Sequence, residues 1–129
     1  MKKLLVLAVA GASFLHSSCK KEEHPAPVTA TLEVTAPLAN QEFTVGDTVF
    51  IKGSVKSERS LHGYHVTILG LAGDSAYHTH NHSHGNEIII NEWWIAATDS
   101  TAVYDLILDC PTDHEGGMVS KTIPIKINH

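Results

Sequence analysis

The sequence is poor in cysteine, in methionine and in positive charge. Its 129 residues include two cysteines and two methionines, and nine Lys and Arg stand against 14 Asp and Glu. Two cysteines are too few for a Cys-based structural zinc site, and a single methionine besides the initiator argues against a thioether site for Cu(I). The net charge of −5 with neutral histidines gives no attraction to nucleic acid, so we expect no nucleic-acid partner.

The first 18 residues have the pattern of an export signal. Two lysines precede an apolar run at residues 4–15, which is too short to span a bilayer, and small residues follow just before Cys19. A lone Cys after two serines resembles the cleavage site of bacterial lipoproteins, whose new N-terminal Cys is acylated. This resemblance implies a signal peptide at 1–18 and a membrane anchor on lipidated Cys19.

The segment CKKEEH that begins at Cys19 is similar to the surface-export signal of Bacteroidota lipoproteins. Lys21, Glu22 and Glu23 match its Lys followed by two acidic residues. The resemblance implies a lipid-anchored protein of the outer membrane, exposed at the cell surface. Residues 19–28 combine charges with prolines, so we expect a flexible tether there. With Cys19 lipidated, Cys110 has no disulfide partner and is expected to be a small buried core residue.

Residues 29–129 have the composition of a single all-β domain. Short runs of Val, Ile, Thr and aromatic residues are broken by turn residues at intervals of roughly ten, and no segment keeps a helical period. The pattern predicts an antiparallel β-sandwich of about seven strands. The predicted strands are 29–36, 47–56, 61–71, 76–82, 86–95, 101–110 and 119–128.

Apolar residues at every second position define the predicted core. They are Val49, Ile51 and Val55; Tyr104, Leu106, Leu108 and Cys110; and Ile123, Ile125 and Ile127. Trp93 and Trp94 are adjacent on a predicted strand, so one should face the core and the other solvent, where it offers a platform for a sugar or a peptide. Residues 36–55, APLANQEFTVGDTVFIKGSV, resemble the A-to-B region of bacterial immunoglobulin-like domains, which implies an immunoglobulin-like sandwich.

Four histidines alternate with small polar residues in the segment YHTHNHSHGN at 77–86. They are His78, His80, His82 and His84. Two histidines spaced i, i+2 on a strand have Cα atoms about 6.7 Å apart, so both imidazoles can reach one ion. We take His80 and His82 as the expected two-ligand unit. The alternative is a polar loop that is rich in His and holds no ligand.

Strand pairing and strand direction bring further histidines to this segment. A two-residue turn at Gly73 and Asp74 would place His82 opposite His65 and His80 opposite Thr67. His65, His78, His80 and His82 would then share the outer face of a sheet. Alternating strand directions also bring three loops to one end of the sandwich. These loops carry His62, then His82 and His84, and then Asp113, His114 and Glu115.

Imidazole sets suit Zn²⁺, Cu²⁺ or Ni²⁺, whereas calcium is disfavoured because no Asp-rich calcium loop is present. The candidate ligands are His62, His65, His78, His80, His82, His84 and His114. The first hypothesis is a cell-surface lipoprotein that binds a divalent transition metal as a scavenger or buffer. Such a site needs at least three imidazoles around one point.

The alternative is a non-enzymatic immunoglobulin-like interaction module, either an accessory subunit of an outer-membrane complex or an adhesin-like domain with a protein partner at the cell surface. That role requires an apolar patch near the exposed Trp. No nucleophile motif is present, so we expect no enzyme. Residues 78–94, HTHNHSHGNEIIINEWW, also resemble small Bacteroidota lipoproteins in which an immunoglobulin-like domain carries a His-x-His segment and a following Trp. That resemblance implies a fold and no particular role.

Overall fold

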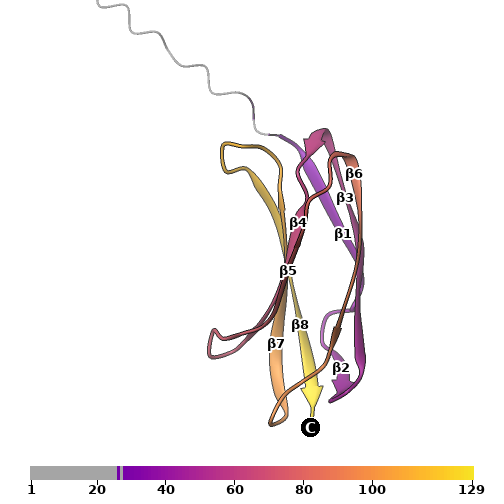
Figure 1. Ribbon diagram of the computed structural model, residues 1–129, viewed down its shortest axis with the longest axis vertical. Helices are drawn as coiled ribbons and strands as arrows, with labels where there is room; N and C mark the ends of the chain where they lie inside the picture. Colours follow the sequence, from indigo (N-terminus) through magenta and orange to yellow (C-terminus); the bar gives the residue numbers. More distant parts are fainter. Residues whose placement is uncertain (1–25, 27) are drawn as a thin grey trace, which may run out of the picture.

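The computed structural model describes residue 26 and residues 28–129, which form two packed β-sheets (Figure 1). The predicted signal peptide, Cys19 and all of the tether except residues 26 and 28 lie outside the described residues. The strands are β1 Ala30–Ala36, β2 Gln41–Thr44, β3 Thr48–Leu61, β4 Tyr64–Gly70, β5 Ser75–Asn81, β6 Gly85–Ile95, β7 Ala102–Pro111 and β8 Met118–Asn128. The described part of the chain contains no helix that could cross a membrane.

One sheet has three strands in the order β1-β3-β6, and the other has five in the order β2-β8-β7-β4-β5. Neighbouring strands run antiparallel, except that β2 lies parallel to β8. The two sheets face each other as two layers in Figure 1. The predicted all-β antiparallel sandwich is therefore confirmed.

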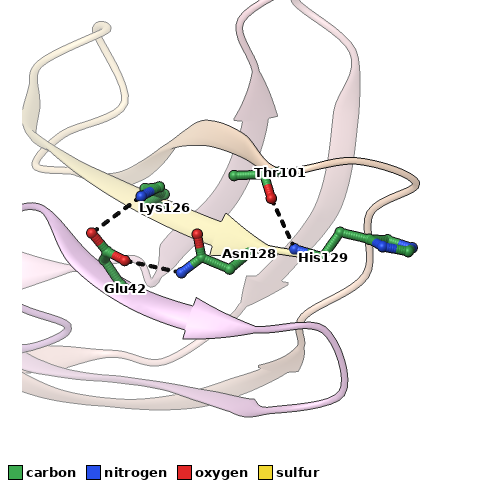
Figure 2. A network of polar contacts seen from close by, with 5 residues as sticks. All are labelled: Glu42, Thr101, Lys126, Asn128 and His129. Carbon is green, nitrogen blue, oxygen red and sulfur yellow. Dashed lines mark hydrogen bonds and ion pairs between the residues drawn. The ribbon is translucent and has the colours of Figure 1, made fainter.

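Strand β2 was not predicted, so the sandwich has eight strands instead of seven. Its four residues show no apolar alternation, because only Phe43 is partly buried. Polar side chains hold it to β8: the Glu42 carboxylate accepts hydrogen bonds from Lys126 Nζ at 3.2 Å and Asn128 Nδ2 at 2.9 Å (Figure 2). These two partners hold the pKa of Glu42 below its usual value. A strand attached in this way gives little signal in the sequence.

Strand β3 also differs from its prediction, because it continues past residue 56 to Leu61. Its pairing with β6 is irregular between Lys56 and Leu61, where the polar residues SERS lie. Strand β4 consequently begins at Tyr64 instead of residue 61. His62 lies in the short connection between these two strands, as predicted.

The core between the sheets is built from the alternating residues that the sequence identified. All ten residues of the predicted set are buried. Trp94 is buried and Trp93 is 59% exposed, which confirms that the adjacent tryptophans face opposite sides. Cys110 is buried as predicted, and burial raises the pKa of its thiol to about 11. At neutral pH this thiol is therefore protonated and unreactive.

One polar contact crosses the core. The hydroxyl of Tyr64, on β4 of the five-stranded sheet, donates a hydrogen bond of 2.6 Å to Glu92 Oε1, on β6 of the three-stranded sheet. Glu92 occupies an inward position between buried Ile90 and Trp94. Burial, followed by the bond to Glu92, raises the pKa of Tyr64 well above its usual value. The bond satisfies an inward carboxylate that would otherwise lose solvation without compensation.

We expect Tyr64→Phe to lower the free energy of unfolding by about 1.5–3 kcal/mol, because the hydrogen bond has a charged acceptor. Urea denaturation measures this loss. Tyr104→Phe is the control, since Tyr104 is another buried core tyrosine, packed on Trp94, and its hydroxyl is not the one bonded to Glu92.

The raised Tyr64 pKa adds a pH signature to the same comparison. The unfolded chain ionises this tyrosine near pH 10, while the folded chain keeps it protonated, so the parent should lose stability as pH rises above about 10. The Tyr64→Phe variant should not show this part of the loss of stability at high pH. Equal unfolding free energies for the Tyr64 and Tyr104 variants would contradict the role assigned to the bond.

Candidate metal site

The hairpin of β4 and β5 carries most of the histidines, and its register differs from the prediction. His80 lies opposite His65 and His78 lies opposite Thr67. The predicted pairs, His82 with His65 and His80 with Thr67, are wrong by two residues. The turn is longer than the predicted two-residue turn: Leu69 pairs with Ser75, the register shifts just before that pair, and the Gly70 N–H bonds to the Asp74 carbonyl. Because the shift is an even number, every side chain keeps its face.

Four histidines form a face cluster on the outer surface of the five-stranded sheet: His65, His78, His80 and His82. The ring centroid of His65 lies 5.9 Å from those of both His78 and His80, and the rings of His80 and His82 are 5.4 Å apart. His65 is half-buried and the other three are exposed. The prediction that they share the outer face is confirmed for His65, His78 and His80, whereas His82 lies just past the end of β5 and contacts His80 from there.

Three more histidines form a loop cluster at one end of the sandwich: His62, His84 and His114. They lie in the β3–β4, β5–β6 and β7–β8 connections. The ring centroid of His62 is 5.3 Å from that of His84 and 4.1 Å from that of His114. The predicted convergence of the three loops is confirmed for these residues. His82 lies in the β5–β6 connection, as predicted, but its ring contacts His80 of the face cluster.

Gly63 lets His62 approach the β5–β6 loop. Its φ is +120°, which disfavours a side chain, and a Cβ at this position would overlap the carbonyl oxygen of Asn81 at the end of β5. The β3–β4 connection therefore lies directly against the last residue of β5. His62 is thereby held within contact distance of His84.

Asp113 shapes the loop that carries His114. Its Oδ1 accepts hydrogen bonds from the backbone N–H groups of Gly117 at 2.7 Å and Glu115 at 2.9 Å. These bonds hold the pKa of Asp113 below its usual value, so the side chain is a carboxylate at neutral pH. Asp113 was expected at this end of the sandwich without an assigned role, and in the structure it folds the β7–β8 loop.

The loop cluster favours neutral imidazole. The pKa of His62 is lowered by desolvation first, and then by the neighbouring imidazoles of His114 and His84, while the Asp113 carboxylate opposes the shift. At neutral pH His62 therefore carries a free nitrogen lone pair. This is the form of imidazole that binds metal ions.

The distances between ring centroids show how closely the loop cluster matches the geometry of a metal site. Two imidazoles that bind one ion at 2.0–2.1 Å in a tetrahedral site have ring centroids about 5 Å apart. The 5.3 Å between His62 and His84 is close to this spacing, while the 4.1 Å between His62 and His114 is shorter. Among the described residues, no three His, Cys, Asp or Glu side chains already surround one point. Ligation thus requires exposed His84 and His114 to rotate about their side-chain bonds.

A third feature lies on the opposite sheet. Four large apolar side chains are exposed on the outer face of β3 and β6 and form an outer patch: Phe50 at 52%, Ile89 at 66%, Trp93 at 59% and Ile95 at 44%. Phe50 lies directly opposite Trp93. Of these four residues, only an exposed Trp was expected from the sequence. The continuous apolar runs in β6 were the signal for exposed Ile89 and Ile95, because an alternating strand would have polar residues at those positions.

Comparison with known proteins adds no family: no protein-family model matches the chain, and a search of the curated proteins gave no match. The resemblance to Bacteroidota surface lipoproteins therefore stays a prediction, as do the lipid anchor and the location at the cell surface. The two histidine clusters and the outer patch are the features from which a function can be inferred.

We expect Gly63→Ala to disturb the loop cluster and the fold together. The matched control is Gly73→Ala, because Gly73 also has a positive φ, of +85°, but a Cβ there meets no atom within 4 Å. The control should lose about 1–2 kcal/mol of stability from the backbone conformation alone. Gly63→Ala should lose about 1–3 kcal/mol more, because the clash with Asn81 is added.

Urea unfolding and an NMR titration of His62 measure the two effects of Gly63→Ala. If the β3–β4 connection moves away, the pKa of His62 should rise towards its usual value of about 6.5, since its desolvation is relieved and its imidazole neighbours are lost. The Gly73 variant should leave this pKa unchanged. Equal stability losses in the two variants would show that the close approach at Gly63 has no role.

Proposed function

We propose that this protein binds a divalent transition-metal ion, Zn²⁺, Cu²⁺ or Ni²⁺, through the loop cluster, and acts as a scavenger or buffer at the cell surface. One observation carries the proposal: the imidazole of His62 lies within contact distance of those of His84 and His114, so side chains from three separate loops meet at His62. Two of the loops are set in place by separate contacts, the β3–β4 connection by Gly63 against Asn81 and the β7–β8 loop by the Asp113 bonds. A chance enrichment of His in one segment does not account for this arrangement.

The chemistry of the cluster supports an imidazole-binding ion. The described part of the chain offers no cluster of thiols, since Cys110 is buried in the core, and its one described Met, Met118, lies on β8. The neutral form of His62 and the Asp113 carboxylate close to it favour a cation. His84 and His114 are exposed, so an ion can reach them from solvent. No enzymatic activity is included in the proposal.

The proposal also includes an immunoglobulin-like classification and a lipid anchor. The strand distribution supports the classification, because β1, β3 and β6 form one sheet and the remaining strands form the other with antiparallel β7 and β8 adjacent. The residues between 1 and 23 that resemble a lipoprotein signal support the anchor. In Figure 1 the described chain begins at the end of the sandwich where β3 leads into β4, which is the end that carries the loop cluster.

Calorimetric titration of the purified protein with Zn²⁺ at pH 7.5 tests the proposal. We expect the double variant His62→Ala/His114→Ala to bind Zn²⁺ at the loop cluster more than about 100-fold more weakly, because loss of a ligand should cost at least as much as loss of an outer-shell partner. His129→Ala is the matched control, since its exposed imidazole belongs to neither cluster and points away from the contacts in Figure 2.

The same titration at pH 5.5 should show weaker binding by the parent protein. Imidazoles with a pKa of about 6.5 are mostly protonated there, and protonated imidazole does not ligate. Binding near pH 6.5 should also release protons into the buffer. If the double variant and His129→Ala bind Zn²⁺ equally well at pH 7.5, the loop cluster is not a metal site.

The outer patch favours a second candidate function, an interaction module that docks a protein partner. It places three exposed apolar side chains on β6 and a fourth, Phe50, on neighbouring β3, and β6 is an edge strand of its sheet that offers unpaired backbone groups. Isolated exposed apolar residues are ordinary, but here Phe50, Trp93 and Ile95 are neighbours on one sheet face, which is typical of a binding surface. This is the patch near the exposed Trp that the alternative hypothesis requires.

Photo-crosslinking on intact cells tests this second candidate. A photoreactive residue replacing Phe50 should give one discrete protein adduct, and the adduct should be lost when Trp93→Ser is added. The control position is Leu71, which is 80% exposed but lies in the β4–β5 turn away from the patch. Adducts that form equally at both positions, or that persist with Trp93→Ser, would remove the patch as a docking surface.

A further inference from the structure

We propose that a second divalent metal ion binds on the outer face of the five-stranded sheet, held by His65 of β4 and by His78 and His80 of β5. The choice of ion rests on the metal-binding function proposed above, while the site itself is separate from the loop cluster. Among the described residues, ring contacts join histidines within each cluster and none joins one cluster to the other.

The pairing of β4 with β5 arranges these three imidazoles as a triangle. His65 lies directly opposite His80, and His78 is the next residue along β5 on the same face. The ring of His65 is equidistant from the other two, at 5.9 Å from each. The Cα atoms of His78 and His80 are about 6.7 Å apart, as for any i, i+2 pair on a strand. Three imidazoles therefore lie next to one another on one face of the β4–β5 pair.

Ligation requires the rings of this triangle to turn from their present arrangement. The rings are now nearly parallel, with interplanar angles of 26° and 29°, so their nitrogens do not yet meet at one point. His78 and His80 are exposed on an edge strand, so core packing holds neither ring in place. The centroids need to approach by less than about 1 Å to reach the spacing of a shared tetrahedral ion.

The surroundings of the triangle suit an ion held by imidazole. Thr67 Oγ1 lies 3.0 Å from His78 Nδ1, so a hydrogen bond there orients the ring and leaves Nε2 for the ion. On the other side of His65, Asp109 of β7 lies directly opposite it on the same face, and its carboxylate accepts a hydrogen bond from Ser120. This negative charge favours a cation beside His65. By the usual affinity order, Cu²⁺ should bind there more tightly than Ni²⁺ or Zn²⁺.

Calorimetric titration with Zn²⁺ at pH 7.5 distinguishes the two sites by stoichiometry. We expect two ions per parent molecule, and one ion for His65→Ala/His80→Ala with the affinity of the remaining loop site changed by no more than about threefold. His62→Ala/His114→Ala should also bind one ion, now at the face cluster. Because His65 is half-buried, the variant His78→Gln/His80→Gln, altered only at exposed positions, should give the same result.

His82→Ala is the control within the same segment, because His82 contacts His80 but is not a ligand of the proposed site. It should retain two ions. If His82→Ala and His80→Ala weaken Zn²⁺ binding equally, the segment binds metal as a loose tract and the three-histidine site is overturned. Circular dichroism of each variant confirms that the fold is intact.

The possible stoichiometries separate this inference from the proposed function. One ion in the parent that is lost only with His62→Ala/His114→Ala overturns the face site and supports the loop site. One ion that is lost only with His65→Ala/His80→Ala supports the face site and overturns the loop site. No binding by the parent overturns both.

Discussion

Every second side chain of strand β4 is buried in the core, and this burial decides which residues lie on the outer surface of the five-stranded sheet. Tyr64, Val66 and Ile68 are buried between the sheets, so His65 and Thr67 must face outwards. Residues that lie directly opposite each other on paired strands share a face. His80 and His78, which lie opposite His65 and Thr67, therefore also face outwards. The face cluster is therefore a consequence of core packing. Moving the histidines inwards would bury several imidazoles and expose the core residues of β4.

The two sheets present different chemistry to solvent. The five-stranded sheet carries imidazoles, a threonine and a carboxylate across β5, β4 and β7, whereas the three-stranded sheet carries the aromatic and aliphatic side chains of the outer patch. The loop cluster lies at the end of the sandwich, at connections between strands. A metal site at that end and a protein contact on the outer patch use separate surfaces, so the two candidate functions are physically compatible.

Short connections and specific contacts, instead of the core, decide the geometry of the loop cluster. His62 is placed by the close approach of Gly63 to Asn81, and the loop of His114 is folded by backbone bonds to Asp113. The Tyr64–Glu92 bond, between the sheets, lies one residue beyond Gly63. The contact that joins the sheets and the contact that places His62 are thus neighbours in the chain.

The amino-acid sequence by itself determined the all-β class, the buried residues, the outward face of His65, His78 and His80, and the end of the sandwich where three loops meet. Each of these follows from the two-residue period of strands or from alternating strand direction, which are local properties of the chain. Only the tertiary structure decided the β4–β5 register, because the register depends on the length of the turn and on the irregularity between Ser75 and Tyr77. It also added strand β2, which is attached to β8 by Glu42 and not by an apolar pattern. Finally, it divided seven histidines into two clusters, because ring contacts depend on side-chain positions from strands and loops that are distant in sequence.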